Sequence, residues 1–184
     1  MRPRSISREQ IDSIALELFL ARGYAEVTTD DLIKACGVSR PTFFRYVPSR
    51  DALVLDHIAR FGEQVAELLS DRTDEYAWVA LREAVCSAVE SLDPNSHPGM
   101  AFRVLQSSPG IRSSALELTR TWRRQLTAAL VDRTHFAGDE DRCEAAAAMA
   151  IGLFQMAWAR PGTGLAGLRR AFDDAHHLTR QEEA

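Results

Sequence analysis

Near the N-terminus a glycine separates two short helical segments, and this arrangement limits the possible folds more than any other feature of the chain. Thr28 or Thr29 can cap the first segment, and Gly37 is placed to end it. Ser39 can cap the second segment, residues 40–46. Two short helices joined by a tight glycine turn are typical of the helix-turn-helix motif.

The residues before this pair are also expected to form a helix. Ser7 and Gln10 match the two ends of a capping box, and Gly23 is a natural terminator. Apolar residues recur at helical spacing and leave Asp12 outside; they are Ile11, Ile14, Ala15, Leu18 and Phe19. We therefore predict a DNA-binding domain of three helices in residues 1–48.

Helix breakers divide the rest of the chain into further helical segments, and no segment shows the sustained period-two alternation of a strand. The segments lie near residues 50–70, 75–92, 100–107, 110–134, 139–159 and 164–180. We predict an all-α fold of about nine helices, with residues 49–184 as a second, helical domain.

The charge is unevenly distributed along the 184 residues, whose net charge is −4. Residues 1–50 carry eight Lys and Arg against six Asp and Glu, whereas the remainder carries 14 against 20. A basic head on an acidic body is compatible with a head that contacts phosphate. No apolar run reaches the ~18 residues of a membrane helix, so we expect a soluble cytoplasmic protein.

The three cysteines are far apart, and no Cys/His cluster has metal-ligand spacing. Buried free thiols are the simplest interpretation of Cys36, Cys86 and Cys143. We find no nucleophile elbow, phosphate loop or HExxH motif. The sequence therefore predicts no enzyme, no metal and no cofactor.

The side chains of residues 40–46 suit the helix that enters the major groove in a helix-turn-helix. Arg40 and Thr42 offer a bidentate donor and a small hydroxyl for base edges or phosphates. Arg45 and Tyr46 offer further donors. Phe43 is expected to point inward and anchor this helix on the first one.

These features together resemble the tetracycline-repressor (TetR) family of bacterial transcriptional regulators. The likeness covers roughly residues 8–56 and follows the family's usual order of motifs. The matching stretches are Phe19-Leu20-Ala21-Arg22-Gly23-Tyr24, Val27-Thr28-Thr29, Asp31-Leu32-Ile33, Ala35-Cys36-Gly37-Val38-Ser39, Thr42-Phe43-Phe44-Arg45-Tyr46-Val47 and Ser49-Arg50-Asp51-Ala52-Leu53. This combination is far more specific than a helix-turn-helix alone.

The resemblance implies an all-α homodimer that binds a DNA operator and whose second domain, residues 49–184, binds a small hydrophobic effector that releases the DNA. The expected DNA-binding residues are Thr28, Thr29, Ser39, Arg40, Thr42, Phe44, Arg45, Tyr46 and Arg50. Phe44 stands where the family usually has a phosphate-binding tyrosine, and Tyr46 is an alternative source of that contact. Arg50 replaces the usual lysine and Val47 the usual phenylalanine.

Two C-terminal segments are candidates for the dimer interface. Residues 139–159 are apolar nearly all round, so most of this helix must be covered. Residues 164–180 carry a second apolar stripe, which includes Leu165, Leu168 and Phe172. Ordinary monomer core is the alternative, but the family resemblance favours a homodimer through 139–159 and 164–180.

Aromatic residues of the second domain are candidates for the effector pocket, since such pockets are mostly apolar. They are Phe61, Trp78, Phe102, Trp122, Phe154 and Trp158. Plain core packing is the alternative for each of them. At the level of function, the alternative to an effector-released repressor is a ligand-independent repressor or an architectural DNA-binding protein.

Overall fold

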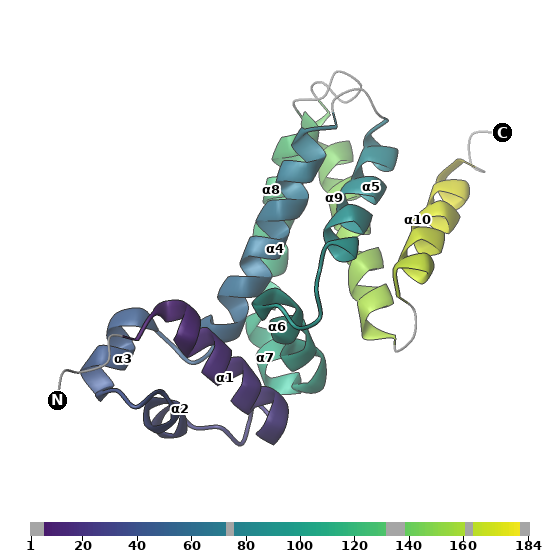
Figure 1. The fold of residues 1–184 in the computed structure, drawn as a ribbon. Helices are drawn as coiled ribbons and strands as arrows, with labels where there is room; N and C mark the ends of the chain where they lie inside the picture. The colour runs from purple at the N-terminus through teal and green to yellow at the C-terminus, as the bar shows by residue number, and fades with distance from the viewer. Residues whose placement is uncertain (1–5, 73–75, 132–138, 161–163, 181–184) are drawn as a thin grey trace. The chain divides into compact units, whose positions relative to one another are not determined.

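The computed structural model describes residues 6–72, 76–131, 139–160 and 164–180, without the side chains of residues 178–180. Every regular element within these ranges is an α-helix, which confirms the predicted all-α class (Figure 1). The chain packs into two compact units, one of Met1–Arg60 with Asp93–Leu118 and the other of Phe61–Leu92 with Thr119–Ala184. The functional boundary after residue 48 stays a prediction, because these units divide the chain by packing.

The first unit contains α1 (Arg8–Arg22), α2 (Thr29–Cys36), α3 (Arg40–Tyr46), the start of α4 (Ala52–Ser70), α6 (His97–Ser107) and α7 (Pro109–Ser114). Helix α1 packs against α2 and α6. Its core is formed by side chains that are at most 2% exposed, among them Phe19, Leu32, Phe43, Leu53 and Phe102.

The capping residues that the sequence indicated for these helices form the expected hydrogen bonds. Ser7 and Gln10 form a reciprocal capping box at α1, and Thr28, rather than Thr29, forms one with Asp31 at α2. Gly37 ends α2 in the left-handed region, with φ 65°, where a side chain would strain the backbone. The predicted helix–turn–helix succession is therefore formed by the caps that the sequence indicated.

Helix α1 buries Ile11, Ala15 and Phe19 as predicted, but the expectation that Asp12 lies outside is wrong. Asp12 is 3% exposed, and Leu16 is fully buried, whereas Ile14 and Leu18 are only half-buried. A charged residue this deep requires partners, and Asp12 has them on α1 and α4.

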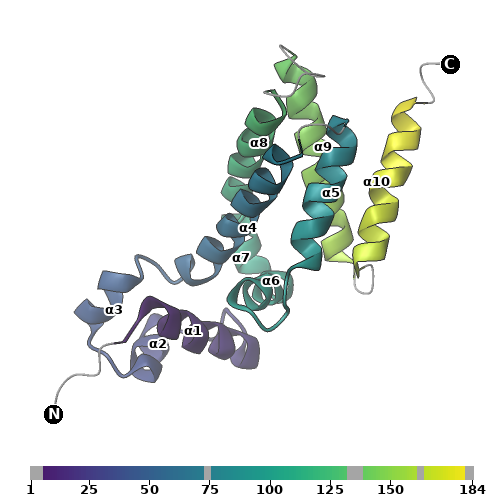
Figure 2. The same ribbon diagram turned by 45° about the horizontal axis from the view of Figure 1, so that its top comes forward.

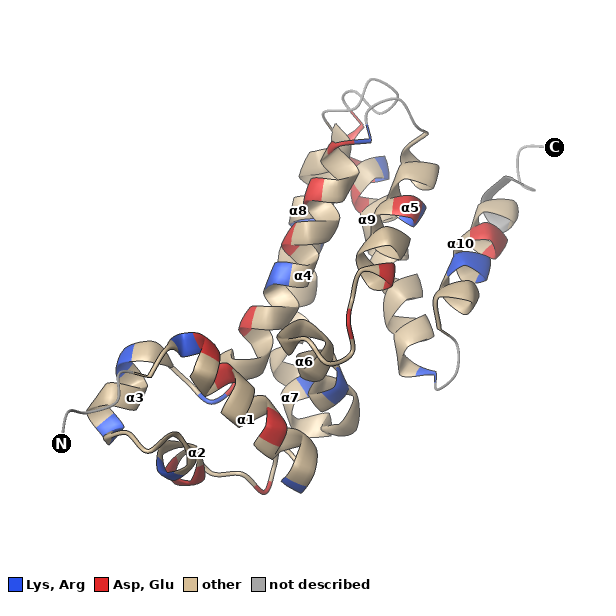
Figure 3. Cartoon of the chain, in the orientation of Figure 1, with Lys and Arg blue, Asp and Glu red and all other residues tan. Residues whose placement is uncertain are grey.

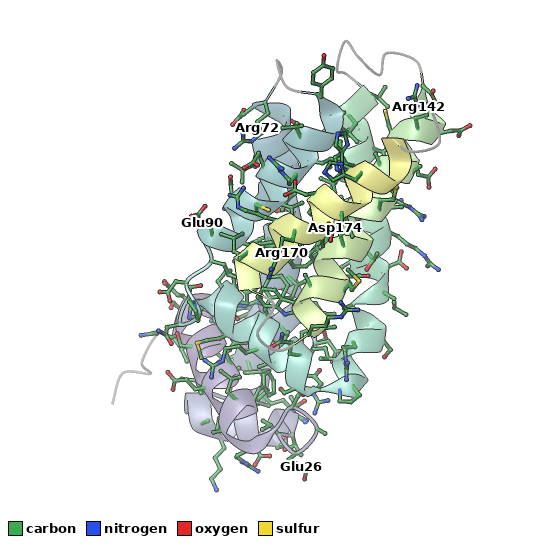
Figure 4. All side chains as sticks on the ribbon, turned by 90° about the vertical axis from the view of Figure 1, so that its right-hand side faces the viewer. Glu26, Arg72, Glu90, Arg142, Arg170 and Asp174 are labelled. Carbon is green, nitrogen blue, oxygen red and sulfur yellow. The ribbon has the colours of Figure 1, made fainter. Side chains whose placement is uncertain are left out.

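The second unit contains the rest of α4 with α5 (Ala77–Glu90), α8 (Leu116–Val131) from Thr119 onward, α9 (Glu140–Ala159) and α10 (Gly164–Arg180). Helices α5, α9 and α10 lie side by side (Figures 1 and 2). Exposed residues of α10, such as Arg170 and Asp174, lie on the helix nearest the viewer in Figure 4. Glu83 of α5 joins this helix through Arg169, at 3.0 Å.

Two predicted boundaries are wrong for reasons of local chemistry. The expected segment 110–134, whose last three residues lie outside the described ranges, contains two helices that meet at Ala115, where the poor helix former Ser occupies both preceding positions. Helix α6 begins at His97 and not near 100, because Ser96 caps it and Pro98 lies in its first turn, where proline is tolerated.

The three cysteines are free thiols that differ in exposure. Cys86 and Cys143 are fully buried, and Cys36 at the end of α2 is half-buried. Burial raises the pKa of the Cys86 thiol to about 11 and also raises the pKa of Cys36.

Candidate nucleic-acid interface

Helix α3 separates its side chains sharply into a buried and an exposed set. Phe43 is fully buried, whereas its neighbour Phe44 is 43% exposed. Arg40 and Arg45 are exposed as well. The helix carries basic residues at both ends and no acidic one (Figure 3). Its outer face is therefore basic and aromatic, as a helix that enters the major groove requires.

The exposed arginines each lie against an aromatic ring. The guanidinium of Arg40 lies 5.7 Å from the centroid of Phe44 and donates to Asp30 Oδ1 at 3.0 Å. The guanidinium of Arg45 lies 4.9 Å from the ring centroid of Tyr46. Such contacts restrict long side chains that would otherwise lose more conformational freedom on binding.

Hydroxyl groups cap the N-termini of both α2 and α3. Ser39 accepts a hydrogen bond from the Thr42 amide, and the two side-chain hydroxyls lie 2.9 Å apart. Thr28 Oγ1 donates to Asp31 Oδ2 at 2.7 Å. Hydroxyls and amides of this kind position a protein on the DNA backbone.

Arg50, expected to contact phosphate, is placed in the packing of the first unit. Its Nη1 donates to the carbonyl of Val27 at 2.8 Å, and its guanidinium lies 4.3 Å from the ring centroid of Tyr24. Tyr24 donates to Asp51, and Ser114 of α7 donates to the other oxygen of that carboxylate at 2.9 Å. Burial and the bond to Asp51 raise the pKa of Tyr24 to about 12.

Sequence reasoning missed a polar network beside α3. Arg8 contacts Asp12 and Asp56, and His57 Nε2 lies 3.3 Å from Asp12 Oδ2. His57 is 2% exposed. The i, i+4 spacing of Arg8 and Asp12 was a usable signal, but the partners on α4 are remote in sequence.

Asp12→Asn is expected to remove part of the acid sensitivity of the protein. Burial alone would raise the pKa of Asp12, but hydrogen bonds from His57 and Arg8 outweigh it and hold the pKa below 3.8. At a pH between the lowered pKa of Asp12 in the folded state and its ordinary pKa in the unfolded state, the unfolded state binds more protons. The stabilisation is therefore complete above the unfolded pKa and is lost as pH falls through the folded one.

The check is urea unfolding of both proteins from about pH 7 down to about pH 3. The wild-type unfolding free energy should fall more steeply than that of the variant below about pH 4. Other shifted carboxylates, such as Glu83, are present in both proteins, so the difference between the two curves isolates Asp12. Parallel curves would contradict this account.

The structure brings together four of the six candidate pocket residues, all in the second unit. Phe61 and Phe154 stack with ring centroids 5.4 Å apart, and Phe154 stacks on Trp158 at 5.7 Å. Trp122 lies 6.0 Å from Phe61. We call Phe61, Trp122, Phe154 and Trp158 the aromatic cluster.

The other two candidates lie elsewhere. Trp78 packs on Phe172 of α10, to whose carbonyl it donates at 3.2 Å. Phe102 is 1% exposed in the core of the first unit. Both are thus placed as packing residues, and neither is part of the aromatic cluster.

A small cavity lies beside the aromatic cluster, and its volume of about 20 Å³ fits one water molecule at most. The Trp122 indole nitrogen is buried there without a hydrogen-bond partner. The same indole lies so close to Gly62 that a Cβ at that position would come within 1.9 Å of Nε1. A ligand of ordinary size therefore requires the cluster to open further.

Within the parts of the chain that the structure describes, no helix is long and apolar enough to cross a membrane. Over the same ranges, no three His, Cys, Asp or Glu side chains come together in a way that could hold a metal ion.

Comparison with known proteins bears directly on α1–α3. A family model described as bacterial regulatory proteins, tetR family, matches residues 13–56. The chain is 32% identical to the HTH-type transcriptional regulator EthR of Mycolicibacterium smegmatis over 71% of its own length and 62% of that protein, so it spans less than two thirds of EthR. It is 28% identical to the regulator TcmR of Streptomyces glaucescens over 96% of this chain and 84% of TcmR.

A solved structure extends the likeness to the whole fold. The TetR family repressor AlkX of Dietzia sp. strain DQ12-45-1b matches with a TM-score of 0.62 and 18% identity, over 98% of each chain. At this identity the match concerns the fold alone. The fold likeness includes the chain beyond residue 56, which the family model does not reach.

Proposed function

Because the chain belongs to the TetR family of bacterial transcriptional regulators, we propose that it is a cytoplasmic repressor that binds a roughly palindromic operator as a homodimer. A small hydrophobic effector releases it from the DNA. The main support for this proposal is the division of α3 into two faces. The helix buries Phe43 in the core and presents Arg40, Phe44 and Arg45 outward.

Each exposed side chain of α3 suits a different part of the DNA. Arg40 is suited to the O6 and N7 acceptors of guanine, and Thr42 to a neighbouring base edge. Phe44 has no donor or acceptor, so its ring suits the C5-methyl group of thymine rather than a phosphate. Arg45 and the hydroxyls of Thr28, Ser39 and Tyr46 then supply phosphate contacts. Thr29 and Arg50 complete the proposed contact set.

Selection of bound duplexes from random DNA tests the proposal. The wild-type protein should enrich an inverted repeat whose half-sites lie one or more turns, ~34 Å each, apart. Arg40→Ala should lose ~1–3 kcal/mol of discrimination at one position of each half-site. Arg60→Ala on α4 is the matched control, since Arg60 is exposed outside α3. Equal effects of the two substitutions would reject this role for α3.

The homodimer is proposed through α9 and α10. Helix α9 keeps an exposed apolar stripe although its other face is buried in the second unit. Met149 and Met156 are 38% and 39% exposed and lie about two helical turns apart, and Gly152 lies exposed between them. An exposed apolar stripe with small residues at its centre suits close packing against a second copy.

The aromatic cluster is the proposed effector site. A buried indole N–H without an acceptor costs about 1–3 kcal/mol, and a ligand that places an acceptor against Trp122 Nε1 recovers it. Stacked rings around that donor favour a flat, apolar molecule with one polar atom. The alternative, a ligand-independent repressor or architectural protein, leaves the cluster as core.

A thermal-shift screen of flat apolar compounds separates these alternatives. A true effector should raise the melting temperature and weaken operator binding by about 5- to 150-fold. It should also change the fluorescence of the cluster tryptophans, so that Trp122→Phe reduces the signal and Trp78→Phe, on α5, retains it. Stabilisation without any loss of operator affinity would favour the ligand-independent protein.

A further inference from the structure

The segment that joins α3 to α4 helps to hold α3, the helix proposed to enter the major groove. It runs from Tyr46, the last residue of α3, to Ala52, the first residue of α4. The side chain of Arg8, on α1, binds both ends of it. Nη1 donates to the Tyr46 carbonyl at 2.9 Å, and Nη2 donates to the Ala52 carbonyl at 3.3 Å.

The bond to Tyr46 falls where a helix needs one. The last carbonyls of a helix have no partner within it, and α3 has only seven residues. A cation at this end also interacts favourably with the helix dipole. Arg8 therefore caps the C-terminus of α3 from a position 38 residues earlier in the chain.

Two carboxylates hold the same guanidinium in place. Nε donates to Asp12 Oδ1 at 2.7 Å and Nη2 to Asp56 Oδ2 at 2.8 Å. The side chain of Arg8 is only 27% exposed. With two acidic partners its charge is already balanced, so Arg8 differs from the exposed arginines of α3, which are suited to contact DNA.

The network extends behind Asp12 to α6. His57 lies 3.3 Å from Asp12, and its ring centroid is 5.4 Å from that of His97 at the start of α6. His97 Nε2 in turn lies 2.7 Å from Ser13 Oγ on α1. All of these residues belong to the first compact unit. The hydrogen bonds of Arg8 to the carbonyls of Tyr46 and Ala52, which we call the clamp, are therefore supported within that unit.

We infer that Arg8 is a positioning residue for DNA recognition: it fixes the orientation of α3 relative to α1 and α4 and does not touch DNA itself. The inference rests on the proposed function. Only a planar fork can reach two carbonyls and two carboxylates together, so lysine keeps the charge but not the clamp. Specific binding should therefore depend on the arginine, whereas nonspecific binding, which depends on charges in contact with phosphate, should not.

The test compares Arg8→Lys and Arg8→Gln with wild type, and Arg22→Lys on the same helix is the matched control. The probes are the duplex that the wild-type protein selects and a scrambled duplex of equal length and composition. Affinities are corrected for the active fraction by stoichiometric titration. Both Arg8 variants should lose roughly tenfold or more in the ratio of specific to nonspecific affinity, the size expected for one charge-assisted hydrogen bond.

Salt dependence distinguishes positioning from direct contact. For Arg8→Gln the slope of log affinity against log salt concentration should stay at the wild-type value, because no phosphate contact is lost. A slope reduced by about one would show a direct phosphate contact and overturn the inference. A wild-type specificity ratio in Arg8→Lys would overturn it as well.

Hydrogen exchange gives a readout that does not depend on DNA. In the free protein, Arg8→Lys should speed amide exchange in residues 46–52 by roughly tenfold and leave α10 unchanged. Unchanged exchange in this segment would refute the clamp even if the operator is found. If the wild-type protein selects no DNA sequence, the proposed function fails, and exchange alone still shows whether the clamp exists.

Discussion

Phe43→Ala is expected to lower the free energy of unfolding by about 3–5 kcal/mol, the usual cost of deleting a buried phenyl ring. Phe43 is fully buried, and it is the only residue of α3 that reaches the core of the first unit. Without it, a seven-residue helix has little to hold it in place. Urea unfolding, followed by far-UV circular dichroism, measures the loss.

Phe44→Ala, one residue further along, is the matched control. Its ring is 43% exposed, so the unfolding free energy should change by only about 0.5 kcal/mol. Operator binding should instead lose the proposed thymine contact. Replacing individual thymines by deoxyuridine should weaken wild-type binding at one position per half-site, and this effect should vanish in Phe44→Ala. If Phe44→Ala unfolds the protein as severely as Phe43→Ala does, the division of α3 into two faces is wrong.

Met156→Glu should dissociate the proposed homodimer and thereby cause the largest loss of operator affinity. A carboxylate placed without a partner in an apolar interface costs about 3 kcal/mol or more, roughly a hundredfold in the dimer dissociation constant. A monomer also forfeits the second half-site, worth about 10²- to 10⁴-fold in affinity. Sedimentation velocity and operator titration at the same protein concentration measure the two effects.

Gln155→Glu introduces the same charge on the neighbouring residue of α9. Gln155 is exposed and bonds Thr119 of α8 at 3.1 Å, so its side chain is directed towards α8. This control should leave both the dimer and operator binding unchanged. A Met156→Glu protein that stays dimeric and binds its operator normally would place the interface elsewhere on the chain.

Local signals in the sequence were sufficient for the helix-turn-helix. The caps at Ser7, Thr28 and Ser39 and the left-handed Gly37 involve partners at most four residues away. Their geometry is dictated by neighbouring backbone amides, so short patterns predict it. The division between buried Phe43 and the exposed arginines followed from the same local reasoning.

Features that depend on distant residues were not predictable in this way. The burial of Asp12 depends on His57, and the role of Arg8 depends on backbone atoms at Tyr46 and Ala52. Apolar periodicity indicates that a residue is buried but not which residues surround it. For this reason Phe102 and Trp158 looked alike in the sequence, although the first packs in the core of the first unit and the second in the aromatic cluster.

Because the three thiols are buried to different degrees, a fluorescent dye can be attached to one of them selectively. A maleimide dye needs an accessible thiolate, and the deeply buried Cys86 and Cys143 offer none on the time scale of labelling. Cys36 is the reachable one, and it ends α2, immediately before the turn that presents α3. A single fluorophore can thus be attached beside the recognition helix without any engineered cysteine, and its emission would follow operator capture and release in real time.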